Sequence, residues 1–196
     1  MGKLDFDTLR VTNVQRCVFS FEHALRDWSL SDWIVALGGE VGEGLNVIKK
    51  LNRERDGFGG NTKSLAELEA DFADELADAV LYLDLSLARE GLPLCDWAKD
   101  FAQLQLDAVN RLRDEDAGYS LSDAGRDLFI SAGRLAEAST SLTGAGSGLG
   151  FATAARKVLE DLACLAELAR CDLGAAVARK FNATSQKRGA PERLPA

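Results

Sequence analysis

Apolar side chains recur every three to four residues over long stretches of this chain, and this spacing constrains the fold most strongly. One such stripe falls within residues 31–51 and consists of Ile34, Leu37, Val41, Leu45 and Ile48. A second falls within residues 65–90 and consists of Leu68, Phe72, Leu76, Ala79, Leu83 and Leu87. A period near 3.6 residues places each stripe on one face of an α-helix. Because the chain contains only three prolines, the pattern predicts an all-α protein.

The same reasoning divides the whole chain into helices and loops. Helices are expected over residues 5–24, 31–51, 65–90, 94–114, 121–142, 151–171 and 172–185. The polar, glycine-rich stretches at residues 52–64 and 143–150 are predicted to be exposed loops.

Short internal similarities indicate two related helical units. Residues 28–32 (WSLSD) resemble residues 119–123 (YSLSD), and residues 39–43 (GEVGE) resemble residues 133–137 (GRLAE). We therefore predict an antiparallel helical bundle of two pseudo-repeated units. The predicted divisions are a first unit, a second unit and an exposed tail, at residues 1–92, 93–185 and 186–196.

Charge and composition exclude several classes of protein. The net charge of −8 disfavours a nucleic-acid binder, which needs a positive face for phosphates. The chain has no run of about 18 apolar residues, so no membrane span is expected. Its four cysteines form no CxxC pair, which is typical of free thiols in a reducing compartment. These features predict a soluble, cytoplasmic protein.

Four acidic side chains are candidates for a metal site. Glu40 and Glu43 lie roughly 110° around their helix from the apolar stripe, on a surface that also carries Trp33. Glu75 and Asp78 flank the stripe of the next predicted helix. If the two helices run antiparallel, the four carboxylates can face one another. Such a cluster repels itself, and Mg²⁺, which prefers oxygen ligands, would relieve that repulsion.

Two observations bear on this interpretation. Glycines are unfavourable within helices, so those around the glutamates suggest close approach of another backbone or of a ligand; they are Gly38, Gly39, Gly42 and Gly44. However, Glu-xx-Glu and Glu-xx-Asp pairs are also common on solvated helix faces. The spacing alone leaves both readings open.

Three segments together resemble the MazG-like, all-α nucleoside triphosphate pyrophosphatase superfamily. They are WSLSDWIVALGGEVGEGLNVIKKL at residues 28–51, ADELADAVLYLDL at 73–85 and CDLGAAVARKFNATSQKRG at 171–189. The resemblance implies hydrolysis of a nucleoside triphosphate to the monophosphate and pyrophosphate. It implies Mg²⁺ as the cofactor, with Mn²⁺ as the alternative, bound by Glu40, Glu43, Glu75 and Asp78. Glu43 would activate the attacking water.

The resemblance also implies residues that bind the substrate. Lys180 and Asn182 would contact the triphosphate, and Arg188 is a further candidate cation. Trp28 and Trp33 are candidates for stacking on the base, with core packing as their alternative role. Lys50 could reach phosphates across the loop at residues 52–64, although a lysine at a helix C-terminus also suits the helix dipole without any function.

The expected assembly is a homodimer or an internal pseudo-dimer. At the positions matching Glu40 and Glu43, the second unit carries Arg134 and Glu137, so it could not build its own metal site. The substrate pocket is therefore expected between the two units. A dUTPase-like activity in the same superfamily, and a catalytically silent helical scaffold for dimerisation, are the alternative functions.

Overall fold

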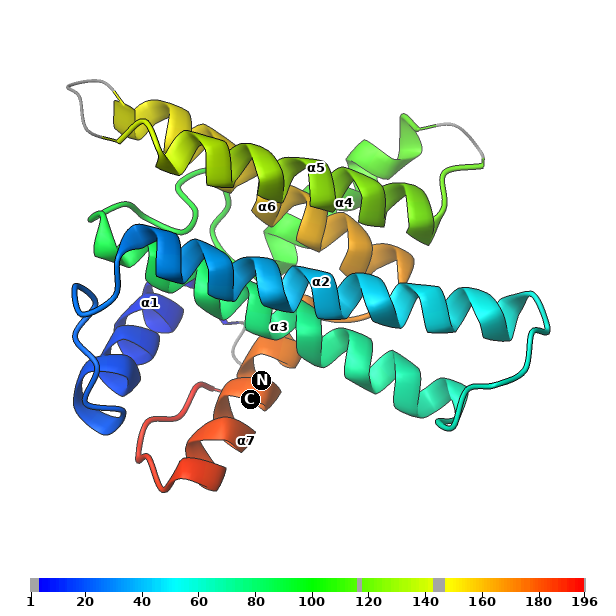
Figure 1. The fold of residues 1–196 in the computed structure, drawn as a ribbon, viewed down its shortest axis with the longest axis horizontal. Coiled ribbons are helices and arrows are strands. Elements are labelled where there is room, and N and C mark those ends of the chain that lie inside the picture. The colour runs from blue at the N-terminus through cyan, green and yellow to red at the C-terminus, as the bar shows by residue number, and fades with distance from the viewer. Residues whose placement is uncertain (1–3, 116–117, 143–146, 196) are drawn as a thin grey trace.

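The computed structural model describes residues 4–115, 118–142 and 147–195, and its named elements are all helices (Figure 1). The helices are α1 (Phe6–Gln15), the π-helical turn η1 (Arg16–Ser20), α2 (Leu30–Arg55), α3 (Leu65–Arg89), α4 (Phe101–Arg113), α5 (Leu121–Ser139), α6 (Ser147–Leu168) and α7 (Leu173–Arg188). Within the described residues, the only β-type pairing is an isolated bridge between Asp5 and Asp100. The predicted all-α fold is confirmed.

Helix α3 is the central element of the bundle. It pairs with α2 in one long hairpin, and it also contacts α1, α6 and α7. Helices α5 and α6 form a second hairpin, which lies against the first through contacts of α5 with α2 and of α6 with α3 (Figure 1). From Ala79 to Leu87 nearly every side chain of α3 is buried, as expected of a helix enclosed by neighbours.

Serine caps determine where the two hairpins begin. The Ser29 side chain caps α2, and the Asp32 carboxylate accepts a hydrogen bond from the Ser29 backbone N–H, which completes a capping box. Ser120 and Asp123 form the same box at the start of α5. The similar segments WSLSD and YSLSD thus occupy the same position in each hairpin, at the start of its first helix.

A buried polar network attaches α1 to α3. The Asp84 side chain is fully buried, and its Oδ1 accepts a hydrogen bond of 2.6 Å from Nε of Arg10. Nδ2 of Asn13 donates to the other carboxylate oxygen at 3.0 Å. A buried carboxylate requires such partners, so this network fixes the position of α1 along α3.

Three predicted helix boundaries are corrected by the structure. The helix expected over residues 5–24 ends as the π-helical turn η1, and Glu22 follows with a positive φ of 52°. The helix expected from residue 94 begins at Phe101, because Pro93 leads into an irregular stretch and Asp100 supplies the N-cap. The helix expected to end near residue 51 continues to Arg55.

The predicted exposed tail is exposed at most of its described positions, but it is neither free of helix nor exposed throughout. Helix α7 continues to Arg188, where Gly189 ends it with a φ of 69°. The residues that follow fold back, so that Ala190 and Leu194 are buried at 5% and 3% exposure. Of the predicted loop at residues 143–150, positions 143–146 lie outside the described residues and positions 147–150 belong to the first turn of α6.

Candidate functional site

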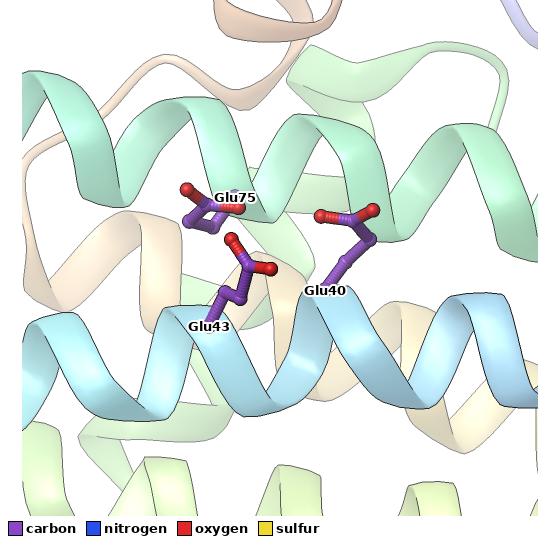
Figure 2. Close-up of side chains that lie close together, drawn as sticks. All are labelled: Glu40, Glu43 and Glu75. Atoms are coloured by element: carbon purple, nitrogen blue, oxygen red, sulfur yellow. The ribbon is translucent and has the colours of Figure 1, made fainter.

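Three of the predicted carboxylates meet where α2 packs against α3. Glu40 and Glu43 lie one turn apart on α2, and Glu75 faces them from α3 (Figure 2). Each offers one carboxylate oxygen, and these three oxygens lie within 4.8 Å of one another. We call Glu40, Glu43 and Glu75 the acidic triad. Because its donors are all carboxylates from two rigid helices, the triad suits a hard divalent cation.

One of the four glycines lies where the two helices pack together, and the other three face open space within the described residues. A Cβ atom built on Gly44 would lie 3.7 Å from Cβ of Glu75. A Cβ atom on Gly38, Gly39 or Gly42 would meet nothing within 4 Å. Within the described residues, another backbone therefore does not approach these three glycines, and the alternative of a bound ligand beside them stays a prediction.

The electrostatics of the triad show uncompensated repulsion. Burial raises the pKa of the Glu40 carboxyl to about 7, and the negative charges of Asp78, Glu75 and Glu43 act in the same direction. The pKa of Glu75 is also raised, first by burial and then by the charge of Glu43. A proton or a bound cation relieves this repulsion, and the two would compete for the same oxygens.

Asp78 lies beside the triad but forms an ion pair of its own. Nζ of Lys180 on α7 lies 2.9 Å from Oδ2 of Asp78 and 3.6 Å from Oδ2 of Asp74. Burial raises the pKa of Asp78, and the Lys180 ammonium opposes that rise. The predicted quartet is thus arranged as the triad plus an Asp78–Lys180 pair. Asp78 and Lys180, two predicted site residues far apart in the sequence, therefore meet in the structure. Lys180 was predicted to contact the triphosphate, and here it contacts an acid that was predicted to bind the metal.

The side chain of Asn182 holds the C-terminal tail instead of facing the triad. Its Nδ2 donates to the Leu194 carbonyl at 2.9 Å, and its Oδ1 accepts from the Leu194 amide at 2.8 Å. Both functional groups of the amide are therefore occupied within the chain. This pairing explains why Leu194 is buried, and the predicted contact of Asn182 with a triphosphate stays a prediction, because one N–H and one lone pair of the amide remain.

The remaining predicted cations lie away from the triad. Lys50 is seven residues beyond Glu43 on α2, which is about 10 Å along the helix axis. Arg188 is exposed in the last turn of α7. A cation that the sequence reasoning missed is Lys63, whose Nζ lies 2.6 Å from Oδ2 of Asp71 and whose pKa is raised by that pairing and, more weakly, by the charge of Glu75. The sequence signal for Lys63 was its position directly before the cap of the helix that carries Glu75.

Beside Asp78 the structure contains a cavity of about 220 Å³, and five of its twelve lining residues carry aromatic rings. We call it the aromatic cavity; it is lined by Asn13, Arg16, Cys17, Phe21, His23, Trp28, Trp33, Asp78, Leu81, Tyr82, Leu85 and Thr184. The rings of Trp28 and Trp33 lie 4.7 Å apart between centroids. Trp33 is 2% exposed and donates from Nε1 to the Leu25 carbonyl, whereas Trp28 is 37% exposed. Both predicted tryptophans therefore reach this cavity, although Trp33 also packs in the core.

Arg16 and Asn13 line the same cavity, and the sequence reasoning did not select them. Both fall within the segment predicted as one helix, where polar residues between apolar ones look like a solvated face. The structure buries them instead, at 6% and 1% exposure. The signal that could have found them is their spacing of three residues, which places both on one helix face.

No family model, curated protein or solved structure matches this chain. The resemblance to MazG-like enzymes therefore rests on the three sequence segments quoted above. Within the described residues, no helix combines the length and the apolar character needed to cross a membrane.

Proposed function

We propose that this chain is a Mg²⁺-dependent nucleoside triphosphate pyrophosphohydrolase of the MazG-like type. The observation that carries the proposal is the acidic triad, with three carboxylate oxygens within 4.8 Å of one another, next to a cavity with aromatic walls. Asp78 links the two features, because it lines the cavity and its charge acts on Glu40. Such a pairing suits a ligand with a polyphosphate at one end and a flat ring at the other.

The triad would hold the metal ion, and Asp78 would assist once its pairing with Lys180 changes. When bound, Mg²⁺ neutralises phosphate oxygens and lowers the pKa of a coordinated water. Because the net charge of the protein is −8, a polyphosphate would otherwise be repelled from this region. Lys180 supplies the nearest cation, and it would share its charge between Asp78 and the substrate.

Glu43 is the proposed general base. It is the exposed member of the triad, so its carboxylate is the one most accessible to a water molecule from solvent. In the proposed reaction, water supplies the new P–O bond and one P–O bond of the α–β anhydride breaks. Glu43 takes the proton from the water, and the products are a nucleoside monophosphate and pyrophosphate.

The direct test is to incubate the protein with each common NTP and dNTP, and with dUTP, with and without Mg²⁺, and to measure pyrophosphate. Release is expected only with Mg²⁺. Glu43→Gln should lower kcat by about 100-fold or more, the usual contribution of a general base. Glu69→Gln, an exposed position on the same helix as Glu75, is the matched control and should leave kcat unchanged.

Two results would refute the proposal. One is the absence of pyrophosphate from every nucleotide, which would favour the reading of a silent helical scaffold. The other is full activity in the Glu43→Gln variant with normal helical circular dichroism. Release of pyrophosphate from dUTP alone would instead identify the dUTPase-like alternative.

A further inference from the structure

Asn13 presents a hydrogen-bond acceptor without a partner at the wall of the aromatic cavity. Its Nδ2 donates to the Leu81 carbonyl at 3.1 Å and to Oδ2 of Asp84 at 3.0 Å. Because both of these partners are acceptors, the amide cannot be turned over, and the free atom must be Oδ1. Within the described residues this buried oxygen has no donor.

Arg16 presents a cation at the same wall. Its Nη1 donates to the Phe181 carbonyl at 2.9 Å and to Oγ of Ser185 at 3.4 Å. The guanidinium lies over the Phe181 ring, 3.5 Å from its centroid. Among the residues that the structure describes, no carboxylate lies within 4.0 Å of this guanidinium and no acceptor meets its Nε or Nη2. The side chain is 6% exposed, so Nε and Nη2 are left to donate to a ligand at this wall.

The two groups together form a specific hydrogen-bonding pattern. Asn13 and Arg16 are three residues apart on continuous helical backbone, so their side chains leave the same face. Nε and Nη2 of an arginine form a fork that donates to two neighbouring acceptors. Both residues line the cavity, so its wall combines the two donors of this fork with one acceptor that has no partner, together with aromatic rings on which a flat ligand can stack.

We propose that Arg16 and Asn13 read the edge of a nucleobase in the aromatic cavity and favour guanine and cytosine. This inference rests on the proposed function for the identity of the ligand. Guanine presents the acceptors N7 and O6 followed by the N1–H donor, and cytosine presents O2 and N3 followed by its amino group. Adenine, uracil and thymine alternate acceptors with donors, so one N–H of the fork would face another donor.

The test uses nucleosides without added metal, so that its outcome is independent of pyrophosphate release. Guanosine, cytidine, adenosine and uridine are titrated against a Trp97→Phe protein, and binding is followed by tryptophan fluorescence. Trp97 packs against Arg156 outside the aromatic cavity, so its removal leaves the signal to Trp28 and Trp33. Guanosine and cytidine are expected to bind about 10-fold or more tightly than the other two, since a bidentate contact discriminates on that scale.

Two variants test the roles of the residues separately. Arg16→Lys keeps the charge and can still donate to the Phe181 carbonyl, but it loses the fork, so the preference should fall below about 3-fold. Arg113→Lys, at an exposed site on α4, is the matched control. Trp28→Ala should weaken the binding of all four nucleosides and leave their order unchanged.

Three results would overturn the proposal: no nucleoside binds, adenosine or uridine binds as tightly as guanosine and cytidine, or folded Arg16→Lys protein keeps the full preference. If the Arg16→Lys protein loses its helical circular dichroism, two other results test the proposal: the order of nucleoside affinities in the Trp97→Phe protein and the effect of Trp28→Ala on that order.

Discussion

Glu40 is the residue whose environment differs most from that of an ordinary surface acid. The helical wheel predicted that Glu40 would lie on a different face of its helix from the apolar stripe, and the structure places it between the helices beside Glu75. The sequence could predict the side of the helix that Glu40 occupies. It could not predict the pKa of about 7, which depends on burial and on charges that α3 brings near.

This raised pKa predicts how metal-free stability changes with pH. The folded protein holds a proton on Glu40 that the unfolded chain loses near pH 4.5, so stability should fall as the pH rises from about 4.5 to about 7. We expect the free energy of unfolding to fall by about 1 kcal/mol, because solvent screens the charge of a side chain that is not fully buried. This loss corresponds to a fall of about 2–4 °C in Tm. Thermal unfolding of the wild-type and Glu40→Gln proteins between pH 5 and pH 8 measures this fall in Tm.

The difference between the two proteins isolates the contribution of Glu40. Glu40→Gln should show a smaller fall in Tm over this pH range, and adding Mg²⁺ at pH 8 should raise the Tm of the wild type more than that of the variant. Identical pH profiles for the two proteins would contradict the assignment.

At the scale of elements, the sequence predicted helices well wherever a cap and an apolar stripe coincide. The start of α3 at Leu65 follows from Ser64 and the stripe that begins at Leu68. The prediction was wrong where tertiary contacts decide the backbone. Nothing local distinguishes the π-helical turn η1 from an α-helix, and Leu194 is held in place by Asn182 through contacts twelve residues apart.

The attachment of α1 to α3 gives a prediction at this scale. Asp84→Ala removes the buried carboxylate that accepts from Nε of Arg10 and Nδ2 of Asn13, and the two side chains keep only their bonds to backbone carbonyls, which should cost about 3–5 kcal/mol. Asp74→Ala removes a partly exposed ion pair with Arg179 and should cost about 1 kcal/mol or less. Urea unfolding of both variants measures the difference, and equal losses would show that the buried network does not hold α1.

At the scale of the whole molecule, the site depends on how the helices pack. The sequence predicted that the first unit carries the acids and that α7 brings Lys180 to them, and the structure places Lys180 against Asp78. It could not predict that Asp78 would form an ion pair with Lys180. The sequence also could not predict the aromatic cavity, because residues of α1, η1, α2, α3 and α7 all line it.

The central claim is that the acidic triad binds a divalent cation. Mn²⁺ is the suitable probe, because the electron paramagnetic resonance signal of free Mn²⁺ falls as the ion binds. Mn²⁺ is titrated into three proteins to measure its affinity for each: the wild type, a Glu40→Gln/Glu43→Gln/Glu75→Gln variant and the Glu69→Gln control. We predict saturable binding to the wild type and the control, and at least about 10-fold weaker binding to the triad variant. Equal Mn²⁺ affinity in all three proteins, with the variant folded, would contradict it.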